Sequence, residues 1–152
     1  MASKQIGSIR KDYGIGELSK ENVSSNPIVQ FESWFKEAYE REGDEANATT
    51  LSTIGLDGHP EGRIVLLKFY SEGGFAFYTN YNSMKGQELE KHDFASLTFH
   101  WKTLERQVRI RGTVEKTNPI ISDDYFDSRP RESRIGAWTE SGDCRSTCFG
   151  RE

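Results

Sequence analysis

The chain has 152 residues, of which 34% are hydrophobic, 12% aromatic and 29% charged, and its formal net charge is −4. This length suits one domain with a real hydrophobic core, and the aromatic share argues against a disordered chain. No apolar run approaches the roughly 20 residues of a membrane helix, and the N-terminus lacks the apolar core of a secretory signal. Two cysteines, Cys144 and Cys148, are too few for a disulfide framework. We therefore expect a soluble, cytoplasmic, single-domain protein.

The charge distribution indicates which anionic ligands the protein could bind. A negative net charge disfavours broad nucleic-acid binding, because neutralising phosphates requires an excess of basic residues. The stretch from Lys102 to Arg134 departs from the overall balance, with eight basic and six acidic residues. This local excess suits a small anion better than a polyanion. A solvated surface of mixed charge explains the count equally well.

The first predicted element is a helix that follows an N-terminal arm. Residues 1–25 carry few apolar side chains, and Asn26 followed by Pro27 is typical of a helix N-terminus. Gly43 is a natural end for this helix. Between these points apolar residues recur at helical spacing, namely Ile28, Phe31, Phe35 and Ala38.

The periodicity then changes to two, which is the period of a β-strand. The second expected strand, at 63–70, is apolar almost throughout, which predicts burial on both of its faces. A short helix is expected over 83–91, capped by Ser83, and another over 119–129. Five closely spaced strands with few helices favour an antiparallel barrel or sandwich decorated by helices. The expected strands cover residues 48–54, 63–70, 75–79, 94–101 and 106–116.

Two cations are expected within the apolar second strand. Arg63 begins it and Lys68 lies inside it, where a charge is costly unless an anion pairs with it. Alternation places the two side chains on opposite faces, so they should not share one ligand group unless a bulge intervenes. The three histidines are scattered along the chain, so no metal site is expected.

Further polar residues indicate a phosphorylated ring as the ligand. Lys85 and the capping Ser83 form a candidate phosphate site, because the N–H groups and dipole of a helix N-terminus favour anions. Gln107 lies on the polar face of the last expected strand, where it can hydrogen-bond the edge of a heterocycle. Arg129 follows Tyr125, and an arginine beside an aromatic residue suits a phosphate on an aromatic ring. Each residue has an ordinary alternative, such as a surface ion pair or a core aromatic, but together they favour a phosphorylated aromatic ligand.

Several sequence blocks follow one another in an order typical of a known family. They are RIVLLK at 63–68, FYTN at 77–80, SMK at 83–85, LERQV at 104–108, YFDSRPRES at 125–133 and IGAW at 135–138. With the stretch from about residue 10 onward, they resemble the pyridoxamine 5′-phosphate oxidase family. The resemblance implies a mainly β fold with flanking helices, a flavin-reductase-like split barrel that binds FMN. This domain would span residues 26–138, between the N-terminal arm at 1–25 and a divergent tail at 139–152.

The resemblance also implies an activity and a set of contacts. It implies a homodimer with FMN at the subunit interface, which oxidises pyridoxamine or pyridoxine 5′-phosphate to pyridoxal 5′-phosphate with O₂ as acceptor and releases H₂O₂. The hydride passes between stacked rings, so no catalytic acid or base is assigned. The implied FMN contacts are Arg63, Ile64, Val65, Leu66, Tyr78, Thr79, Lys85 and Gln107. The implied substrate contacts are Arg10, Lys11, Asp12 and Tyr13, from a segment that covers the substrate, with Lys68, Tyr125, Arg129 and Ser133.

Two departures from the family pattern bear on these expectations. Met84 stands where the family usually has an arginine, so one phosphate contact is expected to be lost. After Trp138 the chain lacks the family's usual Gln-Ser pair and long C-terminal portion, and residues 139–152 show no period. A barrel without its last strands should have an unpaired edge and low stability. The alternative function is therefore a non-catalytic module that binds FMN or pyridoxal phosphate, or that only dimerises.

Overall fold

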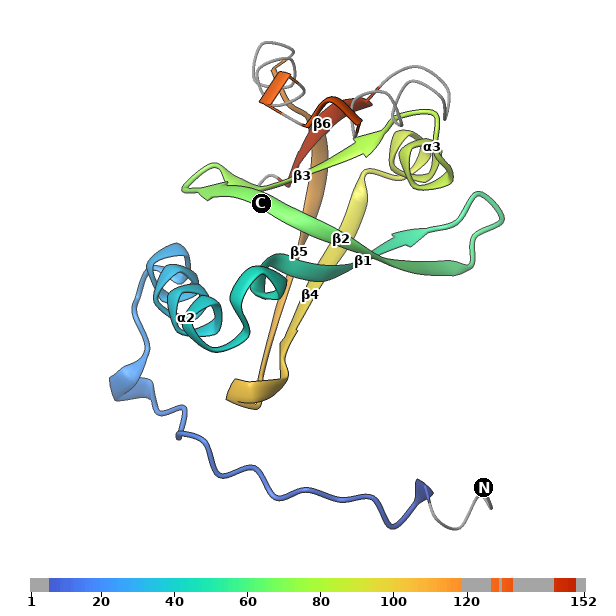
Figure 1. Ribbon diagram of the computed structural model, residues 1–152. Helices are drawn as coiled ribbons and strands as arrows, with labels where there is room; N and C mark the ends of the chain where they lie inside the picture. Colours follow the sequence, from blue (N-terminus) through green and yellow to red (C-terminus); the bar gives the residue numbers. More distant parts are fainter. Residues whose placement is uncertain (1–5, 119–126, 129, 133–143, 150–152) are drawn as a thin grey trace.

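The computed structural model describes residues 6–118, 127–128, 130–132 and 144–149. Antiparallel strands form a closed barrel in the order β1-β2-β3-β6-β5-β4 (Figure 1). Within the described residues no helix combines the length and apolar character needed to cross a membrane. The strands are β1 (Ala48–Ile54), β2 (Pro60–Ser71), β3 (Gly74–Asn80), β4 (Phe94–Trp101), β5 (Arg106–Lys116) and β6 (Cys144–Phe149). The helices are α2 (Pro27–Glu42) and α3 (Met84–Lys91), with 3-10 turns η1 (Lys20–Asn22), η2 (Gly43–Asn47) and η3 (Lys102–Leu104).

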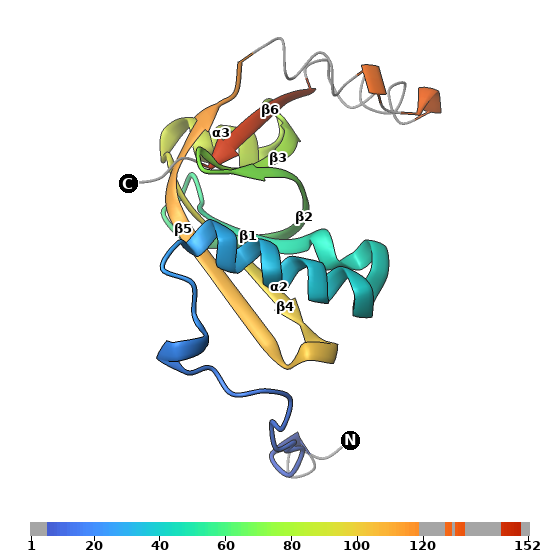
Figure 2. The ribbon, with the colours of Figure 1, turned by 90° about the vertical axis from the view of Figure 1, so that its left-hand side faces the viewer.

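Helix α2 begins and ends as the sequence predicts. The Asn26 side chain accepts a hydrogen bond from the Ile28 amide at 2.8 Å, which satisfies one of the free N–H groups of the first turn. Gly43 ends the helix with a φ of 62°, a left-handed conformation that glycine adopts without a steric penalty. The helix lies across one side of the barrel (Figure 2).

The buried face of α2 fills the barrel with aromatic rings. Phe31 is 3% exposed and packs edge-on against Phe75 of β3, at 4.9 Å between ring centroids. It also contacts Phe99 at 5.4 Å and Trp101 at 6.0 Å, both from β4. The Trp101 indole N–H donates to the Ala46 carbonyl at 2.9 Å, so its polar atom is satisfied inside the core. One helix side chain thus joins two strands that are not neighbours in the sheet.

The prediction that the second strand is buried on both faces is wrong. Val65 and Leu67 of β2 are buried, whereas Ile64, Leu66 and Phe69 are 65%, 45% and 59% exposed. The inner face of a barrel strand is covered by the core, but its outer face is covered only when another surface packs on it. The described residues of a single chain provide no such cover for this face of β2.

The expected unpaired edge after β5 is also wrong in part, because the C-terminal tail supplies a strand. β6 pairs with β3 from Phe75 to Asn80 and with β5 from Val114 to Lys116. Backbone N–H and C=O groups pair whatever the side-chain pattern, so a segment without periodicity can still close a sheet. Most of the helix expected over 119–129 lies outside the described residues.

The Phe31→Ala substitution should lower the free energy of unfolding by about 3–5 kcal/mol, because it removes a buried ring and leaves a cavity. Urea unfolding followed by tryptophan fluorescence measures the change. Val29→Ala is the matched control on the same helix, since Val29 is 50% exposed. Equal effects of the two substitutions would contradict the placement of Phe31 in the core.

Candidate functional site

The first turn of α3 lies close against the end of β3. Ser83 caps the helix by accepting a hydrogen bond from the Gly86 amide at 3.3 Å, and its hydroxyl donates to the Asn80 carbonyl at 2.5 Å. A Cβ at Gly86 would lie 2.3 Å from the Tyr81 carbonyl oxygen, so only glycine permits this approach. The N-terminus of the helix is thereby fixed beside β3.

Two of the predicted FMN contacts meet at the capping serine. The Thr79 hydroxyl lies 3.4 Å from the Ser83 hydroxyl, and the Lys85 ammonium lies 3.4 Å from the same oxygen. An ammonium group beside the positive end of a helix favours an anion. Met84 is 60% exposed next to them and contributes no charge, as its departure from the family pattern implies.

A third predicted contact, Arg63, reaches the same helix from β2. Its guanidinium donates to the Glu88 carboxylate of α3 at 2.8 Å and also bonds the Thr53 hydroxyl of β1. Thr53 in turn donates to Glu88 at 2.6 Å. The Glu88 side chain is 3% exposed and that of Arg63 is 23% exposed. The sequence analysis expected an anion beside Arg63, and the chain itself supplies one, the Glu88 carboxylate. The Lys85 ammonium lies beside the N-terminus of the same helix.

Glu88 is a residue of the candidate site that the sequence analysis missed. Glutamate is almost never fully buried unless it is paired, so its place in a short polar helix gave no sign of burial. The available signal was indirect, because an arginine in an apolar strand requires a carboxylate nearby.

The remaining predicted contacts on β2 and β3 divide between the two faces of the sheet. Ile64 and Leu66 are exposed on the outer face, while Val65 points into the core. Lys68 is exposed and lines a cavity of about 470 Å³ between α2 and β2. Tyr78 on β3 is half-buried. The pairing of β2 with β3 shifts register between Leu67 and Phe69, so a bulge at Lys68 interrupts the alternation that was expected to separate Lys68 from Arg63.

Gln107 is not brought to α3 within one chain. On β5 it pairs with His100 of β4. His100 lies six residues after Phe94, the first residue of β4, and β4 follows α3 in the chain. At roughly 3.3 Å per residue this corresponds to about 20 Å along the strand. Figure 1 shows the turn between β4 and β5 at the bottom of the barrel and α3 near its top. The predicted FMN contacts are therefore split between two ends of the molecule.

The predicted substrate-covering segment lies at the Gln107 end. The Lys11 ammonium pairs with the Glu105 carboxylate at 2.5 Å. The amides of Gly14 and Ile15 donate to the other oxygen of the same carboxylate, at 2.8 and 3.1 Å. The hydrogen bond from Lys11, followed by that from the Gly14 amide, holds the pKa of Glu105 below its usual value. Tyr125, Arg129 and Ser133 lie outside the described residues.

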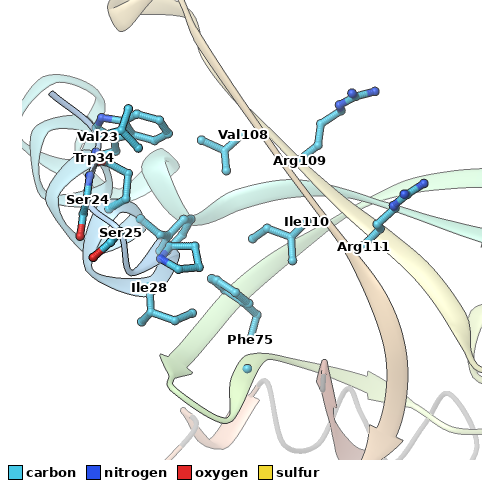
Figure 3. A pocket seen from close by; sticks show the side chains of 14 residues that line it. Val23, Ser24, Ser25, Ile28, Trp34, Phe75, Val108, Arg109, Ile110 and Arg111 are labelled. Atoms are coloured by element: carbon cyan, nitrogen blue, oxygen red, sulfur yellow. Dashed lines mark hydrogen bonds between the residues drawn. The ribbon is translucent and has the colours of Figure 1, made fainter. Parts of the chain in front are cut away.

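A larger cavity lies elsewhere, between α2, the start of β3 and β5. It has a volume of about 680 Å³, and Figure 3 shows Val108 and Ile110 pointing toward α2 and Phe75. The Arg109 and Arg111 side chains extend away from it. An apolar wall does not suit a phosphate, so the charged corner at α3 remains the better candidate for an anion.

Comparisons with known proteins agree with this description. The family model described as pyridoxamine 5′-phosphate oxidase matches residues 35–147. The chain belongs to the pyridoxamine 5′-phosphate oxidase family. It is 51% identical over 138 residues to the pyridoxine/pyridoxamine 5′-phosphate oxidase of Nostoc punctiforme, covering 91% of this chain and 64% of that protein. The oxidase of the same name from Paraburkholderia phymatum is 53% identical over 133 residues, covering 88% of this chain and 63% of that protein. The chain thus spans slightly less than two thirds of these relatives.

Solved structures confirm the split-barrel fold expected of this family. PhzG from Burkholderia lata, crystallised with tetrahydrophenazine-1-carboxylic acid, superposes with a TM-score of 0.76 at 19% identity and covers 90% of this chain and 82% of its own. A pyridoxamine 5′-phosphate oxidase-related, FMN-binding protein from Nostoc punctiforme gives a TM-score of 0.63 at 14% identity, covering 85% of this chain and 82% of its own.

The Glu88→Gln substitution should destabilise the fold by about 3–5 kcal/mol, because it leaves the Arg63 guanidinium without its buried counter-charge. Glu90→Gln is the matched control on the same helix, since Glu90 pairs with Lys116 on the surface and such pairs contribute roughly 0–1 kcal/mol. Both changes are measured by urea unfolding. A Glu88→Gln protein as stable as the control would show that the ion pair does not hold α3 to the sheet.

Docking of the arm on Glu105 should depend on pH. The pKa of this carboxyl is lowered from 4.5 in the docked state, so docking is fully favoured above 4.5 and is lost as the pH falls through the lowered value. Hydrogen exchange at the Gly14 and Ile15 amides, corrected for intrinsic rates, should show protection that disappears in acid. The Asn22 amide is the control, since it donates to the Ser19 carbonyl at 3.1 Å. Parallel loss at all three amides would point to general unfolding instead.

Proposed function

We propose that this chain binds FMN and oxidises pyridoxamine or pyridoxine 5′-phosphate to pyridoxal 5′-phosphate in the cytoplasm. The observation that carries the proposal is the corner at the N-terminus of α3, where Thr79, Ser83 and Lys85 meet. These residues lie in sequence blocks shared with the family, and their arrangement suits a phosphate group. The names of the relatives at about half identity support the same assignment.

The proposed reaction is a two-electron oxidation. With the alcohol, pyridoxine phosphate and O₂ give pyridoxal phosphate and H₂O₂; with the amine, one water also enters and ammonia leaves. FMN supplies the hydride acceptor that passes both electrons to O₂, so the protein needs mainly to bind and orient the two rings.

The residues present fit the cofactor. Lys85 and the first-turn amides of α3 would hold the terminal phosphate, because they provide the positive charge at this corner. The outer face of β2 offers Ile64 and Leu66 as an apolar surface for a flat ring, with Tyr78 on the adjacent β3. Arg63 would act mainly through Glu88, since that carboxylate already pairs with it and fixes the position of α3.

A homodimer would bring together the two parts of the proposed site, which lie at different ends of the barrel in one chain. Within one chain Gln107 lies far along β5 from α3, so one ligand cannot easily touch both. A second copy packed on the exposed face of β2 would cover Ile64, Leu66 and Phe69 and could bring its own barrel end to the α3 corner.

The substrate would lie over the flavin under residues of the N-terminal arm. The proposed contacts are Lys68 and the segment at 10–13, with Tyr125, Arg129 and Ser133 assigned by the family resemblance alone. Lys68 is exposed, as a residue that receives a phosphate must be.

The decisive experiment supplies the purified protein with FMN and pyridoxamine 5′-phosphate and follows H₂O₂ and pyridoxal 5′-phosphate together. Equal amounts of both products are expected. Bound yellow flavin without peroxide would instead support the alternative of a non-catalytic FMN-binding module. Sedimentation of the same samples measures whether the protein is a dimer.

Lys85→Gln should weaken FMN binding about tenfold or more, because it removes a charged partner of the phosphate. Lys91→Gln, at the other end of the same helix, is the control and should change FMN affinity less than about twofold. Quenching of flavin fluorescence on binding measures both dissociation constants. An equal loss in the two variants would contradict a phosphate site at the N-terminus of α3.

A further inference from the structure

We propose that Glu105 is a positioning residue that holds the N-terminal arm over the substrate. This inference rests on the proposed function, in which residues 10–13 contact the substrate. Glu105 lies in the turn between β4 and β5 and is not one of the predicted substrate or cofactor contacts. It would act through the arm alone, by fixing where that segment lies.

The contacts between Glu105 and the arm use both oxygens of its carboxylate. Oε1 pairs with the Lys11 ammonium at 2.5 Å, and Oε2 accepts the Gly14 and Ile15 amides at 2.8 and 3.1 Å. Two of the three contacts are made by the backbone, so they fix the path of the chain rather than one flexible side chain. Hydrogen bonds to a charged acceptor are among the stronger ones in proteins. Covered in this way, the Glu105 side chain is only 4% exposed although it lies at the surface of the barrel.

Apolar burial does not hold the arm in place. The large apolar residues of the arm from Ile6 to Leu18 remain between 52% and 80% exposed, so they remove little surface from water. An extended segment also loses conformational entropy when it is fixed. The polar contacts at Glu105 must therefore supply much of the free energy that docks the arm. The exposed apolar residues are Ile6, Ile9, Tyr13, Ile15 and Leu18.

Glu105 is itself held rigidly, which makes it a fixed anchor. It has a left-handed backbone with a φ of 50°, at the end of the η3 turn. On one side, the amide and hydroxyl of Thr103 donate to the Glu42 carboxylate of α2 at 2.9 and 2.7 Å. On the other, Arg106 pairs with Glu37 of α2 at 2.9 Å. The turn is thus tied to α2 by the residues that flank Glu105.

The anchor lies at the end of the barrel that carries a predicted cofactor contact. Gln107 follows Glu105 by two residues, so a flavin edge bound by Gln107 would lie near the docked arm. Tyr13 is 80% exposed between the anchored Lys11 and Gly14, where its side chain is free to contact a ligand. Release of the anchor would leave the flavin contacts intact and remove the cover over the substrate.

The test compares Glu105→Ala and Glu105→Gln with Glu115→Gln, an exposed glutamate on β5 that serves as the matched control. Alanine removes all three contacts, whereas glutamine keeps an acceptor for the amides and loses the ion pair. Both keep a Cβ, so the strain of the left-handed backbone is unchanged. We expect the increases in arm cleavage and in KM to be largest for Glu105→Ala, smaller for Glu105→Gln and smallest for Glu115→Gln.

The first measurement needs neither cofactor nor activity. In the FMN-free protein, trypsin should cleave after Arg10 and Lys11 about tenfold faster in Glu105→Ala than in the wild type or the control, because the docked arm is protected. Thermal unfolding of the same proteins shows whether the barrel is intact. Equal cleavage rates in all proteins with intact barrels would overturn the role of Glu105 as an anchor.

The second measurement separates substrate binding from cofactor binding. In the FMN-loaded protein, Glu105→Ala should raise the KM for pyridoxamine 5′-phosphate about tenfold and change the dissociation constant of FMN less than about twofold. Faster cleavage of the arm with an unchanged KM would overturn the positioning role. If the wild-type protein produces no peroxide, the proposed function fails, while the trypsin result still decides whether Glu105 anchors the arm.

Discussion

The buried ion pair between Arg63 and Glu88 is the constraint on which the arrangement of the candidate site depends. It joins β2 to α3, and the Thr53 hydroxyl links both groups to β1. A carboxylate and a guanidinium taken out of water stabilise the fold only when both are paired and hydrogen-bonded, which restricts α3 to one position. Because Gly86 allows the helix to approach the Tyr81 carbonyl closely, the first turn of α3 then lies beside Thr79.

The molecule presents two polar centres at opposite ends of one barrel. One is the corner at the N-terminus of α3, where the Lys85 ammonium lies beside the capping Ser83. The other is the turn between β4 and β5, where the Glu105 carboxylate binds Lys11 and the Gly14 amide of the N-terminal arm. Gln107 lies two residues further along the chain. The exposed apolar face of β2 lies on the outside of the barrel, where a second copy could cover it. A cofactor bound across a dimer would use both centres, which is the arrangement proposed for this family member.

Much of the fold could be predicted because local patterns determine it. Asn26, Pro27 and Gly43 mark the limits of α2, and Ser83 marks the start of α3. The alternation of Val108 and Ile110 with Gln107 and Arg109 placed β5 with its polar face outward, as observed. The prediction of an unpaired sheet edge was wrong because β6 is held by backbone pairing with β3, and such pairing does not depend on residue type. The outer face of β2 was misjudged because apolar residues look alike whether a core or a partner covers them.

The sequence by itself determined the strands β1 to β5, the helices α2 and α3 and the family, because these follow from residue type and short spacing. Only the tertiary structure decided which charges meet. It paired Arg63 with Glu88, twenty-five residues away, and Lys11 with Glu105 across most of the chain. It also placed Gln107 and Lys85 at different ends of the barrel. The reason is physical: a charge requires a counter-charge, but many residues along the chain could supply it, and only the packed strands and helices select one.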